Sequence, residues 1–220
     1  MTTIRSVYSE GGIKAVILRS LKKMMLPVVR MGSLIFVECD LRKSLPEISE
    51  LSGIIAREAF ADDANLFEDT QIFLRRLETG HRCFAGIDSA TGKVANYRWI
   101  ATSAAYIPEI DRYINLKPRE VYSYDLKTVP EFRRRGIDSY TRNRTYRHLQ
   151  DQGFTKVYAY VCADNFPMLR SSRLLLKPIG RVWYVQLRGS KCVVLGERRP
   201  GLPELVTSSS SADVQIAECR

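Results

Sequence analysis

Three consecutive arginines followed by a glycine are the most chemically distinctive stretch of this sequence. It reads Arg133-Arg134-Arg135-Gly136-Ile137-Asp138-Ser139. Guanidinium groups bind phosphate through paired hydrogen bonds. A glycine allows a left-handed backbone, which lets several N–H groups point at one anion. The stretch therefore predicts a phosphate site, and the alternative is a solvated basic turn that binds nothing.

Secondary-structure signals on both sides place this turn between a strand and a helix. Residues 121–129 are rich in β-branched and aromatic side chains, which predicts a strand. Pro130 ends that strand because proline cannot donate to a sheet. A helix is expected over 139–152, ending before Gly153. The positive end of this helix and its free N–H groups would face the turn, which favours an anion there.

The same order of elements recurs downstream. Residues 156–162 predict a second strand, and Asn165 follows it closely. A second helix is expected from Pro167, a residue suited to the first turn of a helix, and 182–187 predict another strand. The chain therefore has two predicted strands that each lead into a helix.

The segment 126–138 resembles the acyl-coenzyme A motif of the GCN5-related N-acetyltransferase (GNAT) superfamily. That motif is Arg or Gln, two residues, Gly, one residue, and then Gly or Ala, directly after a strand. Arg133 and Gly136 match it, and Ile137 fits the aliphatic position. The resemblance extends over residues 33–189 and is most specific at this turn.

The sequence departs from the family pattern at three places, one of which is Leu176-Lys177, where the family has Gly-Phe. Asp138 stands where the family has Gly or Ala, and a carboxylate there would repel a pyrophosphate. We therefore expect Asp138 or Ser139 to cap the helix instead. Asn165 matches the family's strand–Asn–helix element, but Ser172 stands where the family often has Tyr.

The resemblance implies an α/β (α+β) fold: a mixed, mostly antiparallel twisted sheet flanked by helices, with a V-shaped splay between the two central parallel strands. It implies acetyl-coenzyme A, or another acyl-coenzyme A, as co-substrate and no metal. The pantetheine arm would pair with the strand, and the turn would hold the pyrophosphate. The cofactor-binding residues so implied are Leu126, Lys127, Thr128, Arg133, Arg134, Arg135, Gly136, Ile137, Asp138, Ser139 and Asn165.

Acyl transfer to an amine also requires proton transfer, because an alkylammonium group must lose a proton before it attacks. Asp125 is the first candidate for the base and Glu120 the second. Strict alternation along a strand places Asp125 on the same face as Lys127 and opposite Tyr124, so an ion pair with Lys127 is the structural alternative. Tyr124, with Tyr158 or water as alternatives, is the candidate that protonates the departing thiolate.

Residues 12–27 predict a basic amphipathic helix. Its apolar positions recur at helical spacing, and its lysines lie elsewhere on the wheel. The apolar positions are Ile13, Ile17, Leu21 and Met24, and the lysines are Lys14, Lys22 and Lys23. The stretch is too short and too charged to span a bilayer or to serve as a signal peptide. It either packs across the sheet of its own domain or binds anionic lipid or a partner.

The remaining elements are simpler to predict. Residues 33–41 predict a first strand, and 45–78 predict two helices separated near Ala61 to Asn65. Residues 82–87 and 94–101 predict a hairpin, and 102–119 an irregular loop or short helix. The domain organisation is then a basic amphipathic extension (1–31), an acyltransferase-like domain (32–200) and a flexible Ser-rich tail (201–220).

Composition restricts the partners. The formal net charge of +10 favours an anionic partner, such as coenzyme phosphates, an acidic carrier protein or a lipid surface. Five scattered cysteines without a CxxC pair argue against a zinc site or a disulfide framework, and only two histidines are present. Reduced thiols fit a cytoplasmic protein.

We therefore predict an N-acetyltransferase that moves an acetyl or other acyl group from acyl-coenzyme A to an amine of a small molecule or peptide by direct attack. One alternative is a long-chain N-acyltransferase that takes its acyl group from acyl carrier protein. Another is a basic nucleic-acid-binding module without catalysis, and it is the less favoured. It is based on the net charge and on the arginines of the turn and the helix, which are Arg133, Arg134, Arg135, Arg142, Arg144 and Arg147. A non-catalytic relative is a third. Peripheral membrane contact through residues 12–27 and a homodimer complete the predicted associations.

Overall fold

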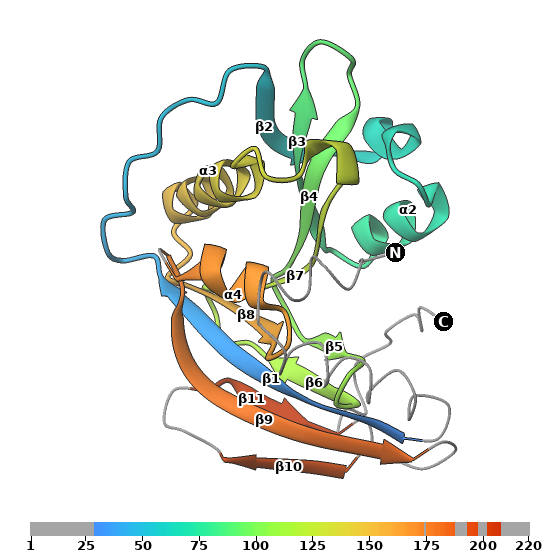
Figure 1. The fold of residues 1–220 in the computed structure, drawn as a ribbon, viewed down its shortest axis with the longest axis vertical. Helices are drawn as coiled ribbons and strands as arrows, with labels where there is room; N and C mark the ends of the chain where they lie inside the picture. Colours follow the sequence, from blue (N-terminus) through green and yellow to red (C-terminus); the bar gives the residue numbers. More distant parts are fainter. Residues whose placement is uncertain (1–28, 174, 188–192, 198–201, 208–220) are drawn as a thin grey trace.

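A large twisted sheet forms the centre of the protein. The computed structural model describes residues 29–173, 175–187, 193–197 and 202–207. Its eight-stranded sheet has the order β10-β9-β1-β8-β7-β4-β3-β2, and a smaller sheet has the order β11-β6-β5 (Figure 1). The strands of the large sheet are β1 (Val29–Asp40), β2 (Ile54–Ala59), β3 (Arg82–Asp88), β4 (Val94–Ala101), β7 (Glu120–Thr128), β8 (Lys156–Cys162), β9 (Lys177–Leu187) and β10 (Val193–Glu197). Those of the small sheet are β5 (Ala105–Ile107), β6 (Arg112–Asn115) and β11 (Glu204–Val206).

Neighbouring strands are antiparallel except at one place. β7 and β8 run parallel, and they pair only over Glu120–Tyr122 and Lys156–Tyr158. Beyond these residues β7 remains paired with β4, and β8 remains paired with β1. The predicted mixed, mostly antiparallel sheet with a splay between its central parallel strands is therefore confirmed.

Helices cover both faces of the sheet. α3 (Ile137–Asp151) packs on β2, β3 and β4, with Tyr146 and Leu149 buried next to Phe84. α2 (Thr70–Glu78) lies on the other face, where Phe73 packs edge-on against Trp99. The remaining helical elements are α4 (Phe166–Ser172), η1 (Ala61–Leu66) and η2 (Pro130–Phe132). Within the described residues, no helix is long and apolar enough to cross a membrane.

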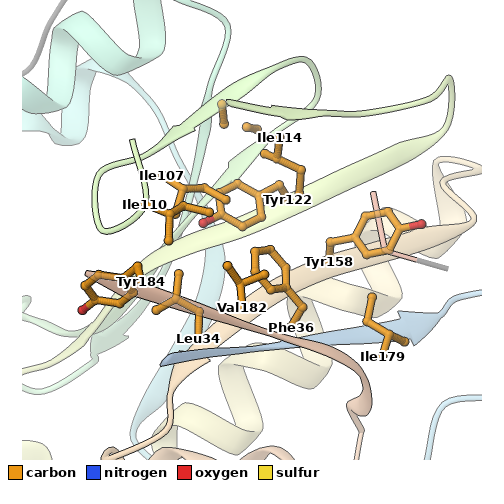
Figure 2. Packing of buried hydrophobic residues seen from close by; sticks show 12 residues of the cluster. Leu34, Phe36, Ile107, Ile110, Ile114, Tyr122, Tyr158, Ile179, Val182 and Tyr184 are labelled. Atoms are coloured by element: carbon orange, nitrogen blue, oxygen red, sulfur yellow. The ribbon is translucent and has the colours of Figure 1, made fainter. Parts of the chain in front are cut away.

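An aromatic and aliphatic core fills the space between the large sheet and the β5–β6 hairpin (Figure 2). Tyr122 and Ile114 meet there, together with side chains from β1, β8 and β9. The predicted irregular loop over 102–119 thus contains two paired strands, β5 and β6. Their buried residues Ile107 and Ile114 explain why the hairpin forms, since both complete this core.

The prediction of two helices over 45–78 is correct only for α2. Residues 54–59 form the edge strand β2, which pairs antiparallel with β3. Gly53, with a φ of +81°, allows the turn into this strand. The spacing of apolar residues fits a helix, but Ile54 and Ile55 are β-branched and β3 offers an unpaired edge, so the sheet prevails.

The described ends of the chain also join the sheets. β1 begins at Val29, within the predicted extension, and lies between β8 and β9. β11 lies within the predicted tail, and that prediction is wrong for this strand because Leu205 pairs with Ile114 and packs on the core. The predicted amphipathic helix over 12–27 and the Ser-rich residues 208–220 lie outside the described residues.

Substitution of Gly86, where α3 approaches the sheet closely, tests the contact between this helix and the sheet. A Cβ atom at Gly86 would lie 2.5 Å from Cγ2 of Thr141 on α3. We expect Gly86→Ala to lower the free energy of unfolding by about 1–3 kcal/mol, measured by urea denaturation, because the helix must move away. Gly196→Ala is the matched control, since its Cβ would meet atoms no nearer than 3.5 Å.

A second substitution checks the cause. Thr141→Ser removes the clashing methyl group but keeps the hydroxyl that donates to Asn96 Oδ1. It should recover part of the loss in the Gly86→Ala background, which a double-mutant cycle would reveal. Strict additivity of the two changes would contradict this explanation.

Candidate functional site

The site begins where β7 leaves β8. From Ser123 onward, β7 pairs with β4 on one side and has no partner strand on the other among the described residues. The backbone groups along that edge are available to an extended ligand, because a strand edge presents unpaired N–H and C=O groups. A pantetheine arm, which carries amide groups, could pair there as a further strand would.

A β-bulge lies in the same stretch. The register between β4 and β7 shifts between Tyr97 and Trp99, so that Asp125 and Leu126 both lie opposite Arg98. Asp125 has a left-handed φ of 44°. A bulge bends a strand and changes which face its side chains occupy. The predicted strict alternation is therefore wrong, because Tyr124 and Asp125 both contact Arg76 of α2.

The side chains after the bulge are engaged elsewhere. Lys127 forms an ion pair with Glu68, so the predicted alternative of a pair with Asp125 is wrong. Thr128 Oγ1 accepts a hydrogen bond from Asn96 Nδ2 at 2.8 Å, and Leu126 is half-buried. The carbonyls of Lys127 and Thr128 also accept, from Asn96 Nδ2 at 3.1 Å and from Arg133 Nε at 3.1 Å, so the remaining main-chain groups of this edge are left for a ligand. A main-chain role is what the resemblance implies.

The basic turn connects β7 to α3. Arg133, Arg134 and Arg135 are exposed, and Arg133 Nε donates to Thr128 O at 3.1 Å. Gly136 is the N-cap residue of α3, with a φ of +74°, and no side chain caps the helix. The first N–H groups of α3 therefore lack side-chain acceptors in the described chain, and they lie beside three guanidinium groups. This arrangement suits a phosphate or pyrophosphate.

The prediction that Asp138 or Ser139 caps α3 is wrong. The carboxylate of Asp138 lies between two buried arginines instead: Oδ1 accepts from Arg98 Nη2 at 2.7 Å, and Oδ2 accepts from Arg142. The side chains of Arg98 and Arg142 are only 2% and 1% exposed. Asp138 is thus neutralised, and the repulsion of a pyrophosphate expected from its sequence position is offset.

This cluster carries an excess of positive charge below the turn, with two guanidinium groups for one carboxylate. Burial lowers the pKa of Arg98, although Asp138 opposes that change. Arg142 also links α3 to α4, since its Nη1 donates to Ser171 O at 3.0 Å. The Nε atoms of both arginines lack a hydrogen-bond partner among the described residues. The local potential therefore favours an anion at the start of α3.

α4 contributes little chemistry of its own. Asn165 is its N-cap residue, and Oδ1 of Asn165 accepts from Met168 N at 3.3 Å. Ser172, where the family often has a tyrosine, is buried and donates to Leu169 O. No phenol from this position reaches the site.

A polar and aromatic cluster lies on the face of β7 that α2 covers. His81 Nδ1 and the Tyr124 hydroxyl are hydrogen-bonded, and the two rings meet edge-on at 5.5 Å. The guanidinium of Arg76 lies 5.4 Å from the Tyr124 ring and pairs with Asp125. Burial, and secondarily the charge of Arg76, lower the pKa of His81 below its usual 6.5. His81 is therefore neutral at physiological pH and able to accept a proton.

A chain of phenols continues from Tyr124. Its ring stacks on Tyr122 at 5.6 Å, and Tyr122 stacks on Tyr160 at 6.3 Å. Tyr160 donates to Glu109 Oε2 at 2.6 Å, and burial raises the pKa of Tyr160 well above its usual range. Burial raises the pKa of Tyr122 too, so Tyr122 and Tyr160 remain protonated at physiological pH. Glu109 adds a carboxylate beside the splay, where an amine could be attracted.

Glu120 occupies the closed end of the splay, three residues before the opening. Its Oε1 accepts from Tyr158 at 3.2 Å, and its Oε2 accepts from the backbone of Lys117 at 3.0 Å. The structure brings Tyr124 and Asp125 together at the bulge and separates both from Glu120 along the strand. Sequence reasoning missed His81, Arg76 and Glu109, and the only signal for His81 is that it is one of two histidines in the chain.

The basic residues of α3 do not form a free cationic face. Arg142 is buried, Arg147 donates to the carbonyls of Leu45 and Pro46, and Arg144 pairs with Glu50. This arrangement removes the main sequence argument for a nucleic-acid-binding helix. Among the described residues, no group of His, Cys, Asp and Glu is arranged to hold a metal ion.

Comparisons with solved structures identify the fold. A GCN5-related N-acetyltransferase from Sphaerobacter thermophilus matches with a TM-score of 0.51 at 12% identity, over 85% of this chain and 58% of the other. A tandem GNAT protein from the clavulanic acid biosynthesis pathway matches with a TM-score of 0.50 at 16% identity, over 79% of this chain and 59% of the other. A functionally unknown protein from Staphylococcus epidermidis matches with a TM-score of 0.50 at 11% identity, over 84% of this chain and 81% of the other.

The chain thus spans less than two thirds of the length of the first two structures. No protein-family model and no curated protein matches the sequence. At these identities the likeness concerns the fold, which is GNAT-like, as the resemblance of the turn implies.

The Asp138 cluster generates a stability prediction. Asp138→Asn leaves Arg98 and Arg142 buried without their counter-charge, so the free energy of unfolding should fall by about 3–5 kcal/mol. Denaturant titration measures the loss. Asp62→Asn, at an exposed carboxylate, should change it by no more than ~0.5 kcal/mol. An equal effect of both substitutions would show that the cluster is not electrostatically coupled.

Proposed function

We propose that this protein is an acyltransferase that moves an acyl group from acyl-coenzyme A to an amine by direct attack, with acetyl-coenzyme A as donor. The observation that carries the proposal is spatial continuity. The open edge of β7 leads directly into the uncapped start of α3, beside three exposed arginines. An extended arm with a pyrophosphate at one end fits both features at once.

In this proposal the main chain of residues 123–128 pairs with the pantetheine arm. Backbone N–H groups near the bulge polarise the thioester carbonyl as charge develops on its oxygen. Arg133, Gly136 and the first turn of α3 hold the pyrophosphate. Asn165 donates to the arm through its amide nitrogen, since Oδ1 serves as the helix cap.

We assign proton transfer to Tyr124 and His81. Tyr124 O accepts the proton that the acceptor amine loses, while the phenol passes its own proton to His81 Nδ1. The C–N bond forms, the C–S bond breaks, and Tyr124 protonates the departing thiolate as His81 returns the proton. One proton therefore moves from the neutral amine to sulfur, after the ammonium form has released its extra proton to water, and both side chains end as they began. The hydrogen bond between Tyr124 and His81, and the lowered pKa of His81, support this route.

Asp125 takes a positioning role in this mechanism. Its ion pair with Arg76 occupies its carboxylate and keeps Arg76 against the Tyr124 ring. The acceptor is an amine of a small molecule or peptide, because Glu109, bonded to Tyr160, places negative charge near the splay. An acyl carrier protein is the alternative donor, and a donor assay with both carriers distinguishes them.

Gly136 provides the test of the coenzyme site. In calorimetric titrations with acetyl-coenzyme A, Gly136→Glu should weaken binding by roughly tenfold or more, which corresponds to 1.4 kcal/mol per factor of ten. The carboxylate would repel the pyrophosphate. Gly92→Glu is the matched control, because Gly92 has a similar φ of +69°, and neither site has another atom within 4 Å of a Cβ.

Binding that is equal in wild type and both variants would place the coenzyme elsewhere. If acetyl-coenzyme A does not bind to the wild type, the proposed donor is wrong, and acylated carrier protein is the next probe.

Tyr124→Phe and His81→Gln test the proton route. Each should lower kcat on the order of 10²-fold while the KM for acetyl-coenzyme A stays unchanged. Tyr106→Phe is the control, since the Tyr106 hydroxyl is bonded to Asp111 in the small sheet. Wild-type activity should persist at pH 6.5 and decline as the pH falls through the lowered pKa of His81, because the imidazole must be neutral.

The acidic limb of this pH profile should disappear in the residual activity of His81→Gln. A profile that is the same in wild type and His81→Gln would assign the limb, and the base, to another group such as Asp125.

A further inference from the structure

An exposed apolar face lies at the end of the large sheet farthest from α2. Five large apolar side chains there are between 42% and 58% exposed: Met31, Trp183, Leu187, Val193 and Leu195. Soluble proteins rarely expose such side chains as a contiguous group unless something covers them. The group therefore requires a partner surface.

Strand register places these side chains on one face. Val29 pairs with Leu187, and Met31 pairs with Val185, which pairs with Val193 on its other side. Trp183 pairs with Ser33 and Leu195 in the next row. Directly paired residues of antiparallel strands share a face, and alternate residues along a strand do so too. The three rows therefore form one patch across β1, β9 and β10, which we call the outer apolar patch.

The opposite face of these strands is already covered. Leu34, Val182 and Tyr184 point into the core that the β5–β6 hairpin closes (Figure 2). On the side of the outer apolar patch, α3 packs on β2, β3 and β4 at the other end of the sheet. In the part of the chain that the structure describes, the extensive contacts of β9 and β10 are with β1 and with each other, and the two strands form the lower edge of the molecule in Figure 1.

We propose that residues 12–27 of this chain pack on the outer apolar patch as a covering helix. The described chain begins at Val29, which lies in the first row of the patch beside Leu187. The segment that leads into this row has its apolar residues at helical spacing, and Pro27 ends it. The occupant is therefore attached to the surface that it covers.

The dimensions agree. Trp183 to Leu187 extends about 13 Å along β9, and three strands are about 10 Å across. A helix is about 10 Å wide, and Ile13 to Met24 would extend about 16 Å along it. Residues 25–28 can span at most about 14 Å, which is enough for the chain to turn back over the sheet.

The charges agree as well. With Ile13, Ile17 and Leu21 against the patch, Lys14 and Lys22 remain in water. Arg181 lies over the Trp183 ring at 5.0 Å and marks the polar end of the patch. The helical layer on this face of the sheet would then continue over β9 and β10.

Trp183 reports directly on this packing. The chain has two tryptophans, and the other, Trp99, is 2% exposed in the core. We would measure acrylamide quenching of tryptophan fluorescence in the full chain, at low protein concentration and without lipid. The expected result is weak quenching in wild type and several-fold stronger quenching in an Ile17→Glu/Leu21→Glu variant. When Trp183→Phe is added to wild type and to the double variant, the two proteins should be quenched equally.

Lys14→Glu is the matched control, because it changes the net charge by the same amount as the double substitution and leaves the apolar positions intact. Its quenching should equal that of wild type. Retained weak quenching of Trp99 in every variant shows that the domain remains folded.

Three results would overturn the proposal. Equal and strong quenching in wild type and in the double variant would show that residues 12–27 do not cover Trp183. Protection that depends on protein concentration would assign the patch to a second copy of the chain. Protection that requires added phosphatidylglycerol–phosphatidylcholine vesicles would assign it to a lipid surface.

Discussion

The left-handed backbone of Asp125, held by Arg76, is the constraint on which the site depends. A non-glycine residue in this region costs on the order of 1–3 kcal/mol, so the surroundings must compensate. Arg76 does so from α2, where it also stacks over Trp99. The bulge lies just beyond the point where β7 and β8 stop pairing, and it brings Tyr124 and Asp125 to the same helix. The unpaired edge of β7 and the hydrogen bond between Tyr124 and His81 thus meet at this bulge.

The arrangement of charges explains how the chain accommodates Asp138 next to its basic turn. Arg98 from β4 and Arg142 from α3 hold Asp138 inside the protein. The three groups form a buried cluster with net positive charge, and this charge lies below the N-terminus of α3. Asp138 looks unfavourable for anion binding in the sequence, but in the structure it belongs to a cluster whose net charge is positive.

Local sequence signals predicted the strand, turn and helix around Gly136, because proline, glycine and β-branched residues act within a few positions. They could not predict the partners of Asp138, since Arg98 is forty residues away in the sequence. They also failed for Ile54 and Ile55, where the free edge of β3 outweighs helical spacing. His81 could not be recognised as a site residue until Tyr124 was placed beside it, and the bulge that places Tyr124 has no sequence signature here.

The position of β1 has a consequence for biosynthesis. This early strand pairs with β8 and β9, which are far from it in the sequence. Asp40 lies opposite Lys156 on β8, and Glu38 lies opposite Lys177 on β9. Long-range pairings of this kind close late, because a large loop must be ordered first. During translation, β1 leaves the ribosome with Leu34 and Phe36 unpaired until most of the chain has followed. We therefore expect the nascent protein to depend on chaperones that shield this strand, and to become native only when β9 emerges.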